Sequence, residues 1–187
     1  MWKQISNWLH RVTNGWITLI ALVIFLGFIA LVLPGQATQT ETQTGTSVSP
    51  DTSFTYSGID LYQMAETYGE QGREGYIRAR FTFDLIFPIV YTLFLVTAIS
   101  WLFGKTLETS SPWMLVNLVP LWGALFDYLE NISTSLVMWR FPTQTPVVAF
   151  LAPIFTLVKW IFVVGSFLIL FLGLGRWLCR WGKDKHG

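Results

Sequence analysis

The chain has 187 residues, of which 52% are hydrophobic and 12% are charged, and its formal net charge is +1. Soluble domains carry about 25% charged residues, so this deficit indicates an integral membrane protein. The near-neutral balance excludes a general electrostatic attraction for nucleic acid. The single cysteine, Cys179, excludes an intrachain disulfide. Both histidines, His10 and His186, lie in terminal segments, so we expect no cofactor and no metal centre among the apolar spans.

The N-terminal part of the chain predicts one membrane crossing. Residues 1–15 are weakly basic and contain two tryptophans, and we interpret them as a cytoplasmic juxtamembrane segment rather than an interfacial amphipathic helix. Residues 16–34 form the first predicted transmembrane helix, because positions 16–33 hold no charged residue and nearly the roughly 20 residues that a crossing needs. A signal peptide is the competing interpretation, but its apolar core spans about 7–15 residues.

Two polar segments follow this helix. Pro34 and Gly35 are expected to end it, and residues 35–56 are rich in Thr, Gln and Ser. Such a stretch buries little apolar surface, so we expect a flexible linker, extended or disordered, rather than an O-glycosylated stalk. Residues 57–80 show helical spacing of apolar residues and predict a short amphipathic helix in the extracytoplasmic loop. The glycines at positions 69, 72 and 75 are expected to break or bend this helix.

The remaining chain predicts three more crossings and a tail. The apolar stretches are 81–103, 113–139 and 147–173, joined by short turns, and residues 174–187 form a basic cytoplasmic tail. The predicted fold is therefore all-α: an integral membrane protein with four transmembrane helices in an antiparallel bundle. Lys and Arg are more frequent in the two terminal segments and the second loop than in the opposite loops. Both termini are therefore predicted to be cytoplasmic, in the plasma (inner) membrane.

The third predicted span carries the most informative polar residues. Asp127, Glu130 and Asn131 are spaced i, i+3 and i+4, which places them on one face of a helix. A charged side chain inside a bilayer is costly and normally faces a partner or a wet cavity. At 1.5 Å per residue, Asp127 and Lys159 each lie about 18 Å from the outer ends of their helices. We therefore predict an Asp127–Lys159 pair, with Glu130 one turn nearer the outside.

Other polar groups complete the predicted site. Asp84 and Tyr91 lie on the second span, and Arg78 and Arg80 come just before it. We expect the two arginines to bind lipid phosphates, with a fold back onto carboxylates as the alternative. Candidate catalytic residues are Asp127 and Glu130. Candidate binding residues are Asp84, Tyr91, Asn131, Lys159, Arg78 and Arg80. No metal ligand is proposed, because two carboxylates beside a lysine and without a histidine suit transition metals poorly.

Three classes of function are compatible with this cluster. The leading hypothesis is a structural or accessory four-helix membrane protein whose buried charges form a paired network. The first alternative is an enzyme that binds or modifies a lipid or isoprenoid, with Glu130 or Asp127 as general acid or base, because the acids outnumber Lys159. The second alternative is a proton- or cation-linked transporter. Expected partners are membrane lipids, a lipid or isoprenoid ligand, and a larger membrane complex or homo-oligomer, but no nucleic acid.

Overall fold

The computed structural model describes residues 1–50 and 53–186 of the chain. Positions 51–52 of the predicted linker and position 187 of the predicted tail lie outside the described residues. Within the described part, 86% of the structure is helix and no strand is present. The elements in chain order are α1 (Trp2–Val12), α2 (Gly15–Gly27), the π-helical η1 (Phe28–Val32), α3 (Leu33–Thr44), α4 (Gly58–Arg80), α5 (Phe83–Thr106), the 3₁₀-helical η3 (Pro112–Leu118), α6 (Val119–Arg140) and α7 (Pro146–His186).

The first long helix continues beyond the point where the sequence was expected to end it. Asn14 caps α2 by accepting hydrogen bonds from the backbone N–H groups of Trp16 and Ile17. The π-helical turn η1 then leads directly into α3, and Pro34 is the second residue of α3. Proline has no backbone N–H, so the helix continues past one missing hydrogen bond. The helix ends at Gly45, whose φ of 71° is the left-handed conformation that glycine favours at a C-cap.

The prediction of an extended or disordered stretch was therefore wrong for the part of 35–56 that forms α3. The Thr38, Thr42 and Thr44 hydroxyls each donate to the carbonyl oxygen four residues earlier, so they are hydrogen-bonded within the helix. Packing stabilises the helix, since α3 lies against α4. A Cβ atom placed on Gly72 would lie only 2.9 Å from the carbonyl oxygen of Gln43. Glycine on α4 thus permits a close approach that stabilises a polar helix.

Three glycines of α4 were predicted to break or bend the helix, and only Gly69 interrupts it in the structure. Ser57 and Asp60 form a reciprocal capping box at its start. Gly69 has φ 63° and ψ −176°, which interrupts the helical geometry. Gly72 and Gly75 stay helical, so they serve packing rather than bending. The buried face of α4 joins residues of α6 and α7 in one apolar cluster: Leu61, Ala65, Tyr68, Tyr76, Val137, Met138, Ala149 and Ala152.

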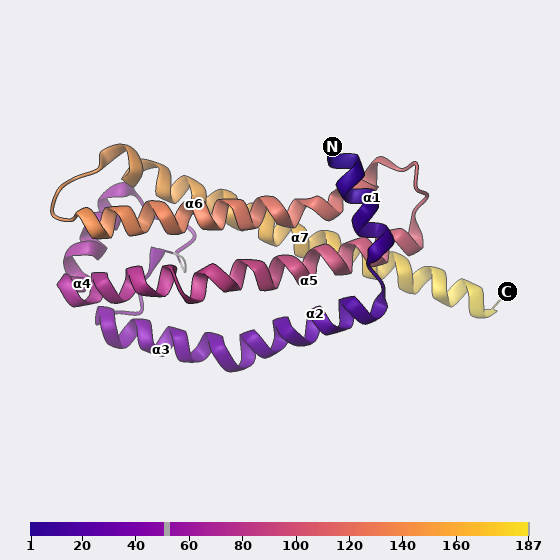
Figure 1. Cartoon of the computed structure of the whole chain (residues 1–187), viewed down its shortest axis with the longest axis horizontal. Helices are drawn as coiled ribbons and strands as arrows, with labels where there is room; N and C mark the ends of the chain where they lie inside the picture. Colours follow the sequence, from indigo (N-terminus) through magenta and orange to yellow (C-terminus); the bar gives the residue numbers. More distant parts are fainter. Residues whose placement is uncertain (51–52, 187) are drawn as a thin grey trace.

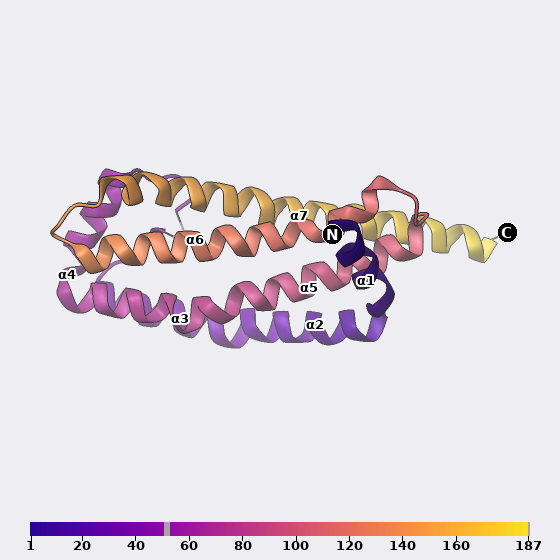
Figure 2. The same cartoon turned by 45° about the horizontal axis from the view of Figure 1, so that its top comes forward.

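The long helices α5, α6 and α7 lie along one another, with α2 packed beside α5 and α3 packed beside α4 (Figures 1 and 2). Both termini lie at one end of the molecule, and α4 lies at the other end. A second apolar cluster joins α2 to α5, with residues of α7 packed against it. Helices α6 and α7 approach closely at Gly123, where an added Cβ atom would lie 3.2 Å from a Val163 methyl group.

Among the described residues, three helical segments are long and apolar enough to cross a membrane: Gly15–Thr44, Gly58–Thr106 and Pro146–Gly182. This property supports the sequence-based prediction of a membrane protein. Large apolar side chains remain exposed along the outer faces of these segments, as lipid contact requires; examples are Ile20, Val23, Ile89, Phe150, Ile161, Leu168 and Phe171. Helix α6 is not one of the three, because it carries the polar residues of the candidate site.

Candidate functional site

A salt bridge between α6 and α7 lies at the centre of the site. It joins Nζ of Lys159 to Oε2 of Glu130. The two residues are 5% and 1% exposed, so neither charge is solvated by water. Buried threonines flank the pair, one from each helix: Thr134 on α6 and Thr156 on α7. Small side chains at these positions let the two helices approach closely enough for the charged groups to meet.

A second ion pair lies at the junction of α4 and α5. Nε of Arg80 is 2.9 Å from Oδ2 of Asp84, and both residues are buried. The guanidinium also lies over the ring of Tyr76, with Cζ 4.6 Å from the ring centroid, in cation–π geometry. Arg80 therefore folds back onto a carboxylate, which was the alternative to phosphate binding in the sequence-based prediction. Arg78 instead is exposed at the surface of α4.

Asp127 and Asn131 connect these pairs to α5. The Tyr91 hydroxyl donates to Oδ2 of Asp127 at 3.0 Å, and Nδ2 of Asn131 donates to Oδ1 at 3.3 Å. Nδ2 of Asn131 also lies 3.4 Å from the backbone carbonyl oxygen of Asp84. Asn131 thus bridges α6 to the start of α5. We call the whole set the charged network: Arg80, Asp84, Tyr91, Asp127, Glu130, Asn131 and Lys159.

The structure brings most of the predicted site residues together, and it contains a salt bridge that was not predicted. Lys159 was expected to pair with Asp127, and in the structure it forms a salt bridge with Glu130, the neighbouring acid of the same predicted cluster. The reason is rotational, because residues three apart on a helix point about 60° away from each other. Asp127 faces Tyr91 of α5, whereas Glu130 faces α7. Of the predicted residues, only Arg78 lies away from the charged network.

A second buried polar cluster was missed by the sequence analysis. The Ser6 hydroxyl donates to Oδ1 of Asn117 at 2.8 Å, and Nδ2 of Asn117 donates to the Ser100 hydroxyl at 2.9 Å. All three residues are 0% exposed. This cluster ties α1 to α5 and η3, and we call it, with His10, the terminal network. Ser100 and Asn117 are polar residues inside two predicted apolar spans, and this was the available signal in the sequence. Their partner Ser6 lies on α1, outside those spans.

His10 extends the terminal network to two backbone carbonyls. Its Nδ1 lies 2.8 Å from the carbonyl oxygen of Ser100, and its Nε2 lies 2.9 Å from that of Met114. A neutral imidazole carries only one N–H, so both contacts are hydrogen bonds at once only when the ring holds both protons. His10 therefore contributes to the docking of α1 on the ends of α5 and η3.

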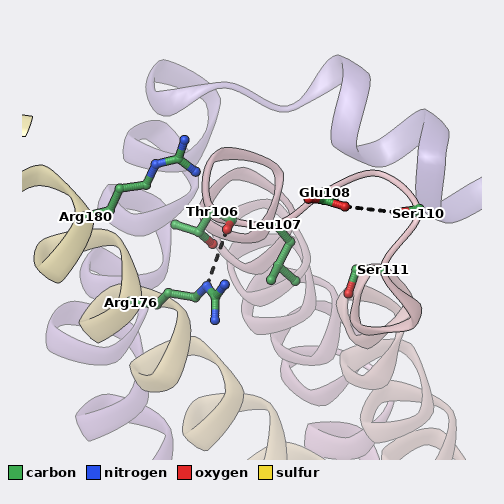
Figure 3. Close-up of a pocket in the computed structure, with 7 residues that line it drawn as sticks. All are labelled: Thr106, Leu107, Glu108, Ser110, Ser111, Arg176 and Arg180. Carbon is green, nitrogen blue, oxygen red and sulfur yellow. Dashed lines mark hydrogen bonds between the residues drawn. The ribbon is translucent and has the colours of Figure 1, made fainter.

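Two open pockets lie outside the charged network. One of about 560 Å³ lies at the end with both termini, between α7 and the segment that follows α5 (Figure 3). The other, of about 420 Å³, lies between α4 and residues 46–48 and 53–56. Neither is lined by a residue of the charged network. Across the described residues, no group of three or more His, Cys, Asp or Glu side chains is arranged to hold a metal ion.

The chain matches no protein-family model, no curated protein and no solved structure. The chemistry of the two polar networks and the pockets is therefore the basis for a functional inference.

Proposed function

We propose that the chain is a four-helix integral membrane protein with a structural or accessory role, in which buried ion pairs fix how the helices meet. The four crossings would be the continuous α2–α3 helix, α5, α6 and α7. The observation that carries this proposal is the nearly complete burial of Glu130 and Lys159, whose charges come from different helices. A buried charge is tolerated when an opposite charge satisfies it, so each of these residues requires the other.

The balance of charge within the network also favours this role. An acid–base enzyme would need a carboxyl group that stays available for proton transfer. Here Lys159 pairs with Glu130 and Arg80 pairs with Asp84. Asp127 accepts hydrogen bonds from Tyr91 and Asn131. Each carboxylate is thus engaged by groups that hold the helices together, and the surplus of acid on which the enzyme hypothesis rests is largely removed by Arg80.

The orientation that we propose follows from the positive-inside rule. Both termini lie at one end of the molecule (Figure 1), and this end carries basic residues from three segments: Lys3, Arg11, Lys105, Arg176 and Arg180. Such clustering favours a cytoplasmic location for that end in a plasma (inner) membrane. Helix α4 would then lie on the opposite side, where it covers the outer ends of α6 and α7.

A double-mutant cycle on Glu130 and Lys159 tests the structural role. The variants Glu130→Gln, Lys159→Met and the double variant would be unfolded in lipid nanodiscs. Each single change leaves one buried charge without its partner and is expected to cost about 3–5 kcal/mol in the free energy of unfolding. The double variant should lose less than the sum of the two. Glu66→Gln and Lys105→Met are matched controls, because both residues are exposed.

The same samples separate the alternative functions. Lipid that co-purifies with each variant would be measured by mass spectrometry alongside stability. If Glu130→Gln and Lys159→Met unfold like the controls, the structural proposal is wrong. Intact folding together with loss of a bound lipid or isoprenoid would then favour the enzyme hypothesis. Intact folding with altered proton or cation flux in vesicles would favour the transporter.

A further inference from the structure

The pocket at the end with both termini has a chemistry unlike that of the charged network. Arg176 and Arg180 form one side of it, and Glu108, Ser110 and Ser111 lie across from them (Figure 3). Its volume of about 560 Å³ is that of a small-molecule site. The lining includes two guanidinium groups and one carboxylate, so its side chains carry a net positive charge.

The two arginines are oriented by the last turn of α5. They are four residues apart on α7, so both point from the same face of the helix. Nε of Arg176 donates to the carbonyl oxygen of Thr106 at 3.4 Å. One terminal nitrogen of Arg180, Nη1, donates to the carbonyl oxygen of Lys105 at 3.1 Å. A guanidinium has five N–H donors, and each of these bonds engages one of them.

The opposite wall of the pocket contributes two serine hydroxyl groups, and one of them contacts the Glu108 carboxylate. The Ser110 hydroxyl lies 3.4 Å from Oε2 of Glu108, within the same loop. The Ser111 hydroxyl caps the start of η3 by accepting from the backbone N–H of Trp113, and its own O–H is a donor. A tetrahedral group with several anionic oxygens suits this arrangement, because planar guanidinium forks match phosphate geometry.

Tryptophans indicate the depth of this pocket relative to the membrane. The ring centroids of Trp101 and Trp177 are 5.8 Å apart, and those of Trp177 and Trp181 are 6.4 Å apart. Trp177 and Trp181 each directly follow one of the two arginines in the sequence. Tryptophan concentrates at the level of the lipid headgroups. A phosphate in this pocket would therefore lie where the bilayer presents its own phosphates.

We propose that this pocket binds the phosphate of an anionic phospholipid headgroup through Arg176 and Arg180. Basic pockets between helices at the cytoplasmic surface are the sites at which anionic headgroups bind. The acyl chains would run along the apolar surface of α7 that precedes Arg176, where Phe171 and Leu172 are exposed. The site is separate from the charged network, so this inference does not depend on the structural role of Glu130 and Lys159.

Retention of individual lipids by the purified full-length chain tests the proposal. The protein would be titrated in detergent with phosphatidylglycerol or phosphatidylcholine, and bound lipid would be counted by native mass spectrometry. The double variant Arg176→Gln/Arg180→Gln should bind phosphatidylglycerol at least about tenfold more weakly, as expected when a charge-assisted hydrogen bond is lost. Lys3→Gln/Arg11→Gln removes the same charge from exposed positions at the same end of the molecule and should bind like the unmodified chain.

Further arms distinguish the source of the phosphate and the role of charge. Arg176→Lys/Arg180→Lys keeps both charges but loses the planar guanidinium groups. Its affinity for phosphatidylglycerol should therefore lie between that of the unmodified chain and that of Arg176→Gln/Arg180→Gln. Inorganic phosphate and glycerol phosphate should fail to displace the lipid at equal concentration. Equal binding by all variants, or an equal loss in the Lys3/Arg11 control, would overturn the site. Displacement by inorganic phosphate at equal concentration would overturn the lipid assignment. Thermal unfolding would confirm that the variants fold.

Discussion

Two buried polar networks hold the helices of this protein together by different means. The charged network near α4 uses opposite charges from separate helices, such as Glu130 and Lys159. The terminal network uses short hydrogen bonds among Ser6, Ser100 and Asn117. A neutral hydrogen bond contributes about 0.5–1.5 kcal/mol, whereas a buried charge that loses its partner costs several times more. The two regions should therefore respond very differently to the loss of one side chain.

The largest expected effect in this comparison is at Arg80. Arg80→Met would leave the buried carboxylate of Asp84 without its cation, at a cost of about 3–5 kcal/mol in the free energy of unfolding. Arg78→Met is the matched control, because Arg78 is exposed two residues earlier on α4 and should change stability by less than about 0.5 kcal/mol. Chemical unfolding in nanodiscs measures both. If Arg80→Met and Arg78→Met change the free energy of unfolding equally, the Arg80–Asp84 pair contributes no more to stability than an exposed charge does.

A smaller effect is expected in the terminal network. Asn117→Leu would remove one hydrogen-bond partner of the Ser6 hydroxyl, which also contacts the Met114 carbonyl oxygen, and one of the Ser100 hydroxyl. The expected cost is about 1–3 kcal/mol, because the site is buried. Hydrogen exchange of the α1 backbone should also become faster, because Ser6 contacts the bundle through Asn117. Asn7→Leu, at an exposed neighbouring position on α1, is the control. Unchanged exchange in Asn117→Leu would show that α1 docks without the hydrogen bonds of Asn117.

The long helices could be predicted from the sequence because their apolar composition is a local signal. The predicted span 113–139 corresponds to η3, which begins at Pro112, and α6 together. Helix α3 could not be predicted in the same way. Its Thr- and Gln-rich sequence has no apolar face, and its stability depends on glycines about 30 residues later that let α4 approach Gln43.

The members of the charged network could also be predicted, but their pairing could not. Depth follows from the fixed rise of a helix, so residues at one level can be identified from position alone. Rotation about the helix axis depends on packing, here on contacts such as Gly123 against Val163. That rotation brings Glu130 to Lys159. His10 was missed because a terminal segment gives no sign of the carbonyls that it meets.

The most direct test of the central claim is an experimental density map of the full-length protein in a lipid bilayer. The account predicts that Nζ of Lys159 lies within salt-bridge distance of the Glu130 carboxylate, between α6 and α7, with no ligand density separating them. A map in which Lys159 points toward lipid, or in which a bound molecule lies between the two side chains, would contradict it.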